Sequence, residues 1–317
     1  MRIVSLLPSA TETLFALGLS EEIVGVSHEC DFPPQAASKR MVIRSRLPHG
    51  APPAEIDRLV REYVSRGESL YAVDTDALLE LAPDLIVTQD LCQVCAASPD
   101  DLASVLRKFE DPPEVLCLNP RDLGDAWRDI LWIGEATCRG HEAEALLKKI
   151  GTRLGELETQ IEMTKSRPRV AFLEWLQPFY VAGHWVPEML ELAGGRDVLG
   201  RKCTASFRVL AEDVMEAAPD VLFIAQCGYS MRQARDEYLA MSLPKGWEDI
   251  PAVRNGEVYA LDASGYFSRP GPRLIAGLEG IARVLHPAIT VGGDARSLSL
   301  RISQESSAPR SIRVATA

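Results

Sequence analysis

The chain has 317 residues, of which 46% are hydrophobic and 25% are charged. This length is enough for two hydrophobic cores, because a single core rarely grows beyond about 250 residues. The formal net charge of -11 argues against a nucleic-acid partner, since an acidic surface repels phosphate. No apolar run approaches the roughly 18–20 residues that a membrane span needs. We therefore expect a globular protein of two domains that neither spans a membrane nor binds nucleic acid.

The N-terminus and the cysteines bear on the cellular compartment. Residues 2–7 form an apolar segment that Pro8 ends, and this segment is too short for a secretory signal, whose apolar stretch has about 7–15 residues. The seven cysteines are scattered and odd in number, which is unlike a disulfide scaffold. These features predict a cytoplasmic protein with reduced thiols, or a periplasmic one if a leader has been removed.

Short apolar strands alternate with helical patterns in the first 140 residues. Ser9 opens a helix and Glu12 follows three residues later, a spacing typical of a capping box. Pro52 and Pro53 begin another amphipathic helix. This alternation of strands and helices predicts a parallel sheet. The expected strands are residues 2–7, 22–27, 41–43, 70–73, 84–88 and 114–118.

A long helix separates this region from a second one. From residue 141 to about 166, apolar residues recur at spacings of three and four, which predicts one continuous apolar stripe on a single helix. The alternation of strands and helices resumes after it. A final segment has too little apolar mass to offset its ordering entropy. We expect an N-terminal α/β lobe at 1–140, a bridging helix at 141–167, a C-terminal α/β lobe at 168–287 and a flexible tail at 288–317.

Two segments, one from each half of the chain, are similar to each other. Asp76 and Glu212 each stand seven residues before a proline, and the Pro-Asp pairs at 83–84 and 219–220 each lead into a strand. Two similar lobes joined by one long helix would explain this repeat. The alternative is a chance similarity between two helix–strand units.

An ordered set of motifs resembles a known family. The sequence Arg-Ile-Val-Ser-Leu-Leu-Pro-Ser-Ala-Thr-Glu at 2–12 is similar to the substrate-binding proteins of vitamin B12 and iron-siderophore ABC importers, and most similar to the vitamin B12 branch. The resemblance implies the class III periplasmic binding protein fold, in which two Rossmann-like lobes with parallel sheets are bridged by one long α-helix and hold a ligand between them. Further matches are Val-Gly-Val-Ser at 24–27, Asp-Phe-Pro-Pro at 31–34, Ala-Pro-Asp-Leu-Ile at 82–86, Gly-Gly at 194–195, Ala-Pro-Asp-Val at 218–221 and Ser-Arg-Pro-Gly-Pro-Arg at 268–273.

The candidate binding residues lie where strands of both lobes end. In open α/β sheets ligands bind at the carboxyl ends of the strands. A cleft with aromatic side chains and a polar rim suits a large, flat and partly apolar ligand. The resemblance implies that this ligand is a corrinoid, above all cobalamin, or a related metal-tetrapyrrole. The predicted ligand-binding residues are His28, Glu29, Gln89, Phe179, Trp185, Phe207, Tyr266 and Arg269.

Four cysteines are candidates for metal binding. Cys92 and Cys95 form a single Cys-x-x-Cys pair, which is half of a zinc site. The fold would bring Cys30 to the same sheet edge and Cys203 to the facing lobe. Such a cluster could bind zinc, an iron–sulfur cluster or the axial face of cobalt or iron. The alternative is that these residues are buried, reduced thiols that behave as small hydrophobic groups.

Asp76 and Glu212 are candidates for docking to a partner. By the resemblance, they correspond to the carboxylates that importer binding proteins present, one per lobe, to arginines of a membrane permease. The alternative is that each acid only stabilises the first turn of its helix through the helix dipole.

Three functions are therefore open. The leading hypothesis is a non-enzymatic carrier, store or sensor that captures a corrinoid. The second is a metallocofactor protein that holds an iron–sulfur cluster or zinc. The third is an importer subunit that delivers its ligand to an ABC permease. Enzyme activity is not expected, because no Gly-x-Ser-x-Gly, P-loop or Gly-x-Gly-x-x-Gly motif is present.

Overall fold

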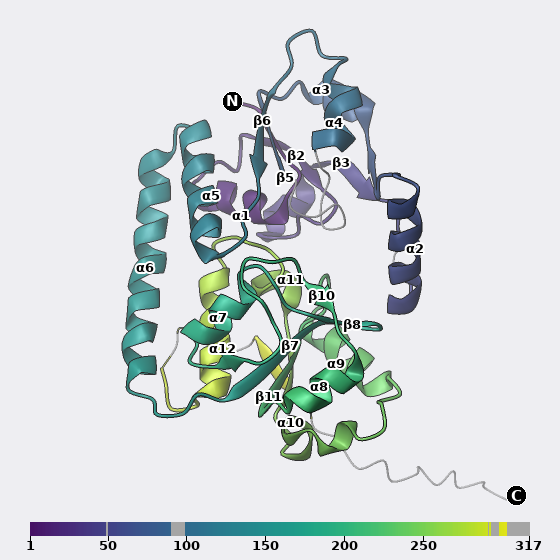
Figure 1. Cartoon of the computed structure of the whole chain (residues 1–317). Coiled ribbons are helices and arrows are strands. Elements are labelled where there is room, and N and C mark those ends of the chain that lie inside the picture. The colour runs from purple at the N-terminus through teal and green to yellow at the C-terminus, as the bar shows by residue number, and fades with distance from the viewer. Residues whose placement is uncertain (49, 90–98, 291, 293–297, 303–317) are drawn as a thin grey trace, which may run out of the picture.

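The computed structural model describes residues 1–48, 50–89, 99–290, 292 and 298–302. It contains two α/β lobes, one above the other in Figure 1, with helix α6 (Gly140–Glu162) running along the side of both. This arrangement confirms the predicted fold class. The long helix keeps Gly151 and Gly155 in its interior, and its buried side chains are Ala143, Ile150, Leu157 and Ile161.

The sheet of the first lobe has the strand order β4-β3-β2-β1-β5-β6. Its neighbours pair in parallel, except that β4 runs antiparallel to β3. The strands are β1 (Ile3–Ser5), β2 (Ile23–Ser27), β3 (Arg40–Ser45), β4 (Tyr71–Val73), β5 (Leu85–Gln89) and β6 (Glu114–Leu118). The helices are α1 (Pro8–Ala16), η1 (Pro34–Ser38), α2 (Pro53–Ser65), α3 (Thr75–Leu81), α4 (Pro99–Leu106) and α5 (Leu123–Ala136).

The sheet of the second lobe has the order β10-β8-β7-β11-β12-β13, with β9 beside β7. Strands β7, β11 and β12 are parallel, whereas β8, β10 and β13 each pair antiparallel with a neighbour. The strands are β7 (Arg169–Leu176), β8 (Phe179–Val181), β9 (Arg196–Asp197), β10 (Phe207–Arg208), β11 (Val221–Ile224), β12 (Val258–Leu261) and β13 (Ser299–Arg301). The helices are α7 (Val186–Leu192), α8 (Ala211–Ala217), α9 (Met231–Ala240), η2 (Trp247–Asp249), α10 (Pro251–Arg254), α11 (Ala263–Tyr266) and α12 (Leu274–Leu285).

The central strands are buried along their whole length. Every residue of β5 and of β11 is buried, because helices or loops cover both faces of each sheet. This double cover explains why these strands are continuous apolar runs in the sequence. Each sheet therefore separates two hydrophobic clusters, one on each face.

The internal repeat predicted from the sequence is present in the structure. Helices α3 and α8 both end on an alanine in the left-handed region, Ala82 with φ 40° and Ala218 with φ 41°. After each helix, an aspartate accepts a hydrogen bond from the backbone N–H at the start of a central strand. Asp84 accepts from Arg2 at 2.6 Å, and Asp220 accepts from Arg169 at 2.9 Å. The two lobes thus use the same device to join helix and sheet.

Two local expectations are wrong. The predicted capping box at Ser9 is absent, since α1 begins at Pro8 and the Glu12 carboxylate bonds to Arg273 of the other lobe. The expected flexible tail also contains an ordered strand, because β13 pairs with β12, and Leu298 and Ile302 on either side of it are 2% and 3% exposed. Apolar burial of these two residues offsets the entropy that the composition suggested would keep them mobile.

Helix α12 ties the lobes to each other and to α6. Arg153 of α6 makes a bidentate ion pair with the buried Glu279 of α12, with both N–O distances at 2.8 Å. Ile275, at the start of α12, packs in a hydrophobic cluster that otherwise belongs to the first lobe and α6. The lobes are therefore joined by apolar packing at Ile275, and a partly buried ion pair holds α12 to the bridging helix α6. Across the described residues, none of the helices is long and apolar enough to cross a membrane.

The burial pattern makes a matched prediction about stability. Leu173 in β7 is 0% exposed, whereas Leu239 in α9 is 50% exposed. We expect Leu173→Ala to lower the free energy of unfolding by about 2–5 kcal/mol, because it removes buried methyl groups and leaves a cavity. Leu239→Ala should change it by no more than about 0.5 kcal/mol. Urea unfolding followed by circular dichroism measures both, and equal effects would contradict the assigned core.

Candidate functional site

A small cavity lies between the two lobes. It has a volume of about 50 Å³, enough for only a few water molecules. The first lobe contributes the segments after β1 and β2 and the last residue of β5, and the second contributes the segments after β11 and β12. These are carboxyl ends of strands, as the sequence analysis predicts. The lining residues are Leu7, Pro8, Ser9, Glu29, Gln89, Cys227, Gly228, Ser264, Ser268, Arg269 and Pro270.

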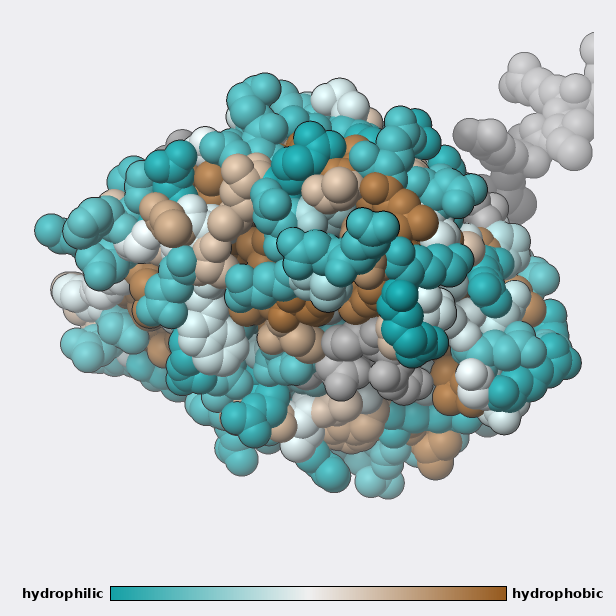
Figure 2. All heavy atoms as spheres, turned by 90° about the horizontal axis from the view of Figure 1, so that it is seen from above, coloured by the Kyte–Doolittle hydropathy of each residue, from teal (hydrophilic) through white to brown (hydrophobic). Residues whose placement is uncertain are grey.

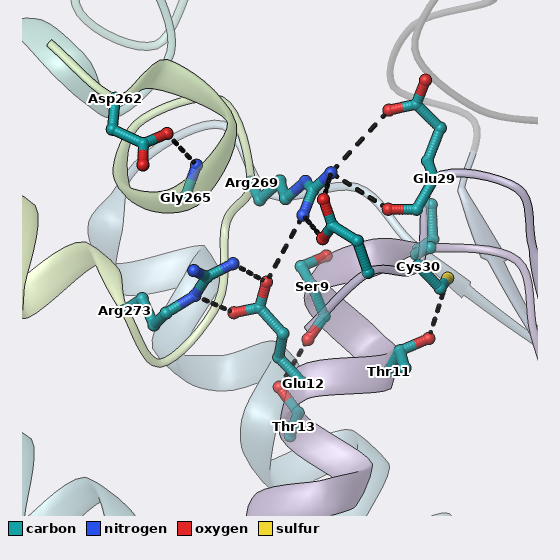
Figure 3. Close-up of polar contacts among 12 residues, drawn as sticks. Ser9, Thr11, Glu12, Thr13, Glu29, Cys30, Asp262, Gly265, Arg269 and Arg273 are labelled. Atoms are coloured by element: carbon teal, nitrogen blue, oxygen red, sulfur yellow. Dashed lines mark hydrogen bonds and ion pairs between the residues drawn. The ribbon is translucent and has the colours of Figure 1, made fainter. Parts of the chain in front are cut away.

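A buried ion pair crosses from lobe to lobe beside this cavity (Figure 3). Arg273 donates from Nε to Glu12 at 2.8 Å and from Nη2 to the other carboxylate oxygen at 2.5 Å. The Glu12 side chain is only 3% exposed. Burial raises the pKa of Glu12 above its usual value, while Arg273 and Arg269 oppose that rise. The pairing thus keeps a carboxylate in a place where it would otherwise tend to be protonated.

A second arginine makes a further bridge between the lobes. Arg269 Nη1 lies 2.5 Å from the Asp31 carboxylate, and its Nη2 donates to the Glu29 carbonyl at 3.0 Å. The same guanidinium is 3.9 Å from the Glu12 carboxylate. Three acidic residues of the first lobe therefore surround one arginine of the second. Because Arg269 and Glu29 also line the cavity, this charged cluster forms one of its walls.

Aromatic rings flank the inner arginine. The Arg273 guanidinium lies 3.9 Å from the Phe32 ring centroid and 5.2 Å from that of Tyr266. Phe32 is 40% exposed, which makes it an apolar surface at the edge of the junction. Tyr266 was predicted as a site residue, whereas Glu12, Phe32 and Arg273 were not. All three missed residues belong to the family-like motifs at 2–12, 31–34 and 268–273, so the signal was present in the sequence, but Glu12 was assigned to a helix cap.

Three of the predicted aromatic residues have partners within the second lobe. Phe179 stacks on Trp247 with centroids 5.1 Å apart, and Trp185 is 5% exposed and donates from its indole N–H to the Phe267 carbonyl. Arg201 covers the Phe207 ring at 4.6 Å. The structure therefore places Phe179 and Trp185 mainly in the core, and none of the three lines the interlobe cavity.

The predicted polar residues of the first lobe divide into two groups. Glu29 and Gln89 both line the cavity. His28 does not line it, since its ring lies 6.2 Å from that of Tyr71 and 3.6 Å from the Glu29 carboxylate. Burial lowers the pKa of His28 below its usual value, which favours the neutral imidazole.

Two cysteines of the proposed cluster, Cys30 and Cys203, are described by the structure, and they do not form a metal site together. Cys30 is 4% exposed, and the Thr11 hydroxyl lies 3.0 Å from its Sγ. Cys203 is exposed, with its Sγ 3.8 Å from the Asp122 carboxylate. Within the described ranges no three His, Cys, Asp or Glu side chains lie close enough to hold a metal ion. Cys92 and Cys95 lie outside the described residues.

Asp76 and Glu212 occupy matching places on the two lobes. Each is the second residue of its helix, α3 or α8, and each is exposed. Viewed from the end of the first lobe that carries α3, the surface is mostly hydrophilic, with apolar residues gathered toward the middle (Figure 2). The two carboxylates are therefore free of the interlobe junction and accessible from outside.

A second cavity lies on the surface of the second lobe. Its volume is about 330 Å³, and it sits beside the turn between β7 and β8. All of its lining residues belong to the second lobe, so closing or opening the lobes does not build or dismantle it. They are Leu176, Gln177, Pro178, Phe179, Arg208, Val209, Leu210, Ala211, Met241, Ser242 and Pro244.

Comparison with known proteins identifies the family. A family model described as "Periplasmic binding protein" matches residues 3–264, so the chain belongs to that family. An uncharacterized ABC transporter substrate-binding lipoprotein, YvrC of Bacillus subtilis, is 24% identical over 90% of this chain and 80% of its own length. A vitamin B12-binding protein of Vibrio cholerae is 23% identical over 90% of this chain and 88% of its own.

Solved structures with the same fold bind different ligands. The vitamin B12-binding protein BtuF of Vibrio cholerae has a TM-score of 0.62 at 23% identity, covering 90% of this chain and 96% of that one. The periplasmic heme-binding protein BhuT, solved with two hemes, has a TM-score of 0.68 at 23% identity, covering 90% and 97%. At this identity the likeness shows the fold.

The family membership decides two of the earlier questions. Its members are substrate-binding proteins of the ABC-importer type, so this chain is a binding protein and not an enzyme. The expectation of a cytoplasmic location is wrong, because the matched family is periplasmic and its relatives are a lipoprotein and periplasmic proteins. That expectation had rested on the short apolar segment at the N-terminus and on the scattered, odd-numbered cysteines.

The burial of Cys30 leads to a test of thiol reactivity. Burial raises the pKa of Cys30 to about 11, so its thiol stays protonated at pH 8 and is a poor nucleophile. The exposed Cys203 is the internal comparison. We expect iodoacetamide at pH 8 to alkylate Cys203 at least about tenfold faster than Cys30 in the native protein. Peptide mass spectrometry reads both sites, and equal rates that become no faster for Cys30 in urea would contradict this picture.

Proposed function

We propose that this protein is the substrate-binding subunit of an ABC importer and that it captures a corrinoid, cobalamin, between its two lobes. The observation that carries the proposal is the interlobe cavity, which both lobes line at the carboxyl ends of their strands. Family membership supports the importer role, and curated relatives named vitamin B12-binding protein support the ligand. The earlier idea of a cytoplasmic carrier, store or sensor is replaced by this role.

The charge of the site favours an amide-edged ligand over a dicarboxylate. Around the cavity, the carboxylates of Glu12, Glu29 and Asp31 face the guanidinium groups of Arg269 and Arg273. This cluster already has one more acid than bases. Heme would add two propionate carboxylates to it, whereas the corrin ring of cobalamin is edged with neutral amides. Like charges brought together in a partly buried site repel each other, so cobalamin fits this balance better.

Binding of such a ligand requires the lobes to separate. A cavity of about 50 Å³ is far smaller than the roughly 300–1,000 Å³ of an ordinary ligand site. The cavity is closed by polar groups and small side chains, including Ser9, Ser264 and Ser268, that would face the ligand once it enters. These hydroxyls can donate to or accept from amides. A ligand of this size therefore needs more room between the lobes than this cavity provides.

Direct titration tests the ligand. We expect cobalamin to bind with one-to-one stoichiometry in isothermal titration calorimetry and to bind more tightly than hemin. Ser268→Trp should weaken binding by about 10–100-fold, because a ring in the cavity must be displaced at a cost of about 1–3 kcal/mol. Ser166→Trp, in the exposed turn after α6, is the matched control and should leave affinity unchanged.

Two outcomes would overturn the ligand assignment. Tighter binding of hemin than of cobalamin would contradict the charge argument. Equal cobalamin affinity of the Ser268→Trp variant and the wild type would place the ligand elsewhere.

Charge reversal tests the importer role. We expect the double variant Asp76→Lys, Glu212→Lys to weaken association with the permease by about tenfold or more, because exposed charges of opposite sign steer and hold such complexes. Its cobalamin affinity should be unchanged. The matched control reverses the charges of Glu80 and Glu216 by substituting lysine for both. These residues are exposed on the same helices, α3 and α8. Equal loss of permease binding in both double variants would show that only net charge matters.

A further inference from the structure

We propose that Glu12 and Asp31 of the first lobe and Arg273 and Arg269 of the second form an interlobe latch that holds the two lobes against each other. The importance of this latch for ligand entry rests on the proposed function, but the latch itself does not.

The latch joins parts of the chain that no shared element holds together. Glu12 lies on α1, and Asp31 lies in the loop after β2, both in the first lobe. Arg269 and Arg273 lie between α11 and α12 in the second lobe, 238 and 261 residues away from their respective partners. Figure 3 shows the two arginines reaching the first-lobe carboxylates from one loop. Every contact of the latch crosses between the lobes, and Ile275, two residues after Arg273, packs in the first-lobe cluster beside it.

The inner pair is the stronger half of the latch. The Glu12–Arg273 pair is bidentate, and its side chains are 3% and 18% exposed. Removing one partner of such a pair leaves a buried charge without compensation, which is strongly unfavourable. The rings of Phe32 and Tyr266 lie within cation–π distance of the Arg273 guanidinium and add to the stability of its position.

The outer pair is the half that a ligand can reach. Asp31 is 65% exposed, while Arg269 is 10% exposed and lines the cavity. An exposed ion pair is weak because water competes with it. Arg269 is thus the residue that exchanges a carboxylate of the protein for a polar group of the ligand, and the outer pair is the first to break. One residue both closes the lobes and presents a donor to the cavity.

Hydrogen exchange on the full-length, ligand-free protein tests the latch. The variants are Asp31→Asn, which changes an exposed side chain, and Glu12→Gln, which changes the buried one. Glu62→Gln is the matched control, since Glu62 pairs with Arg58 and Arg66 within α2 and does not cross between lobes. Peptides that cover 226–229 report on opening, because Cys227 and Gly228 line the cavity without belonging to the latch.

We expect exchange at 226–229 to rise by about threefold in Asp31→Asn and about tenfold in Glu12→Gln, with β5 and β11 still protected. The control should match the wild type. Exchange that rises only at residues 9–13 and 268–274 would mean a local loss of contacts and would overturn the latch. No change in any peptide of Asp31→Asn would overturn it as well, even if Glu12→Gln failed to fold. Because no ligand is present, failure of cobalamin binding leaves this result unaffected.

Discussion

The buried Glu12–Arg273 pair is the interaction on which the geometry of the binding region depends. A carboxylate on the first helix of one lobe is satisfied only when the loop before α12 of the other lobe reaches it. That contact brings Ser268 and Arg269 against Ser9 and Glu29, and so it builds the wall of the interlobe cavity. Leaving either charge alone is costly, so the pair favours the arrangement of the lobes in which both charges meet.

Other contacts also hold the two lobes together. Helix α6 and the Arg153–Glu279 pair hold the lobes together on one side whether or not the latch is closed. The repeated Pro-Asp junctions make each lobe a self-contained α/β unit, with a fully buried central strand in each. Polar contacts that water can replace are concentrated at the junction between the lobes. This division suits a protein that encloses a ligand and later releases it.

Sequence patterns predicted the lobes well because apolar periodicity reflects burial on each face of a sheet. The long helix, the strands at 84–88 and 114–118 and the repeat around Asp84 and Asp220 all follow from this local signal. The junction could not be derived in the same way. Glu12 has a local interpretation as a helix cap, and only the fold shows that Arg273, 261 residues away, is its partner. Trp185 looked like a cleft aromatic, but its ring fills the second-lobe core.

A crystal structure of the protein with bound cobalamin tests the account most directly. We predict electron density for the corrin ring between the lobes, in contact with Ser9 and Glu29 on one side and with Ser264 and Ser268 on the other, and Arg269 turned away from Asp31. Cobalamin seated instead in the surface cavity beside Phe179 and Arg208, with the Arg269–Asp31 bridge intact, would contradict it.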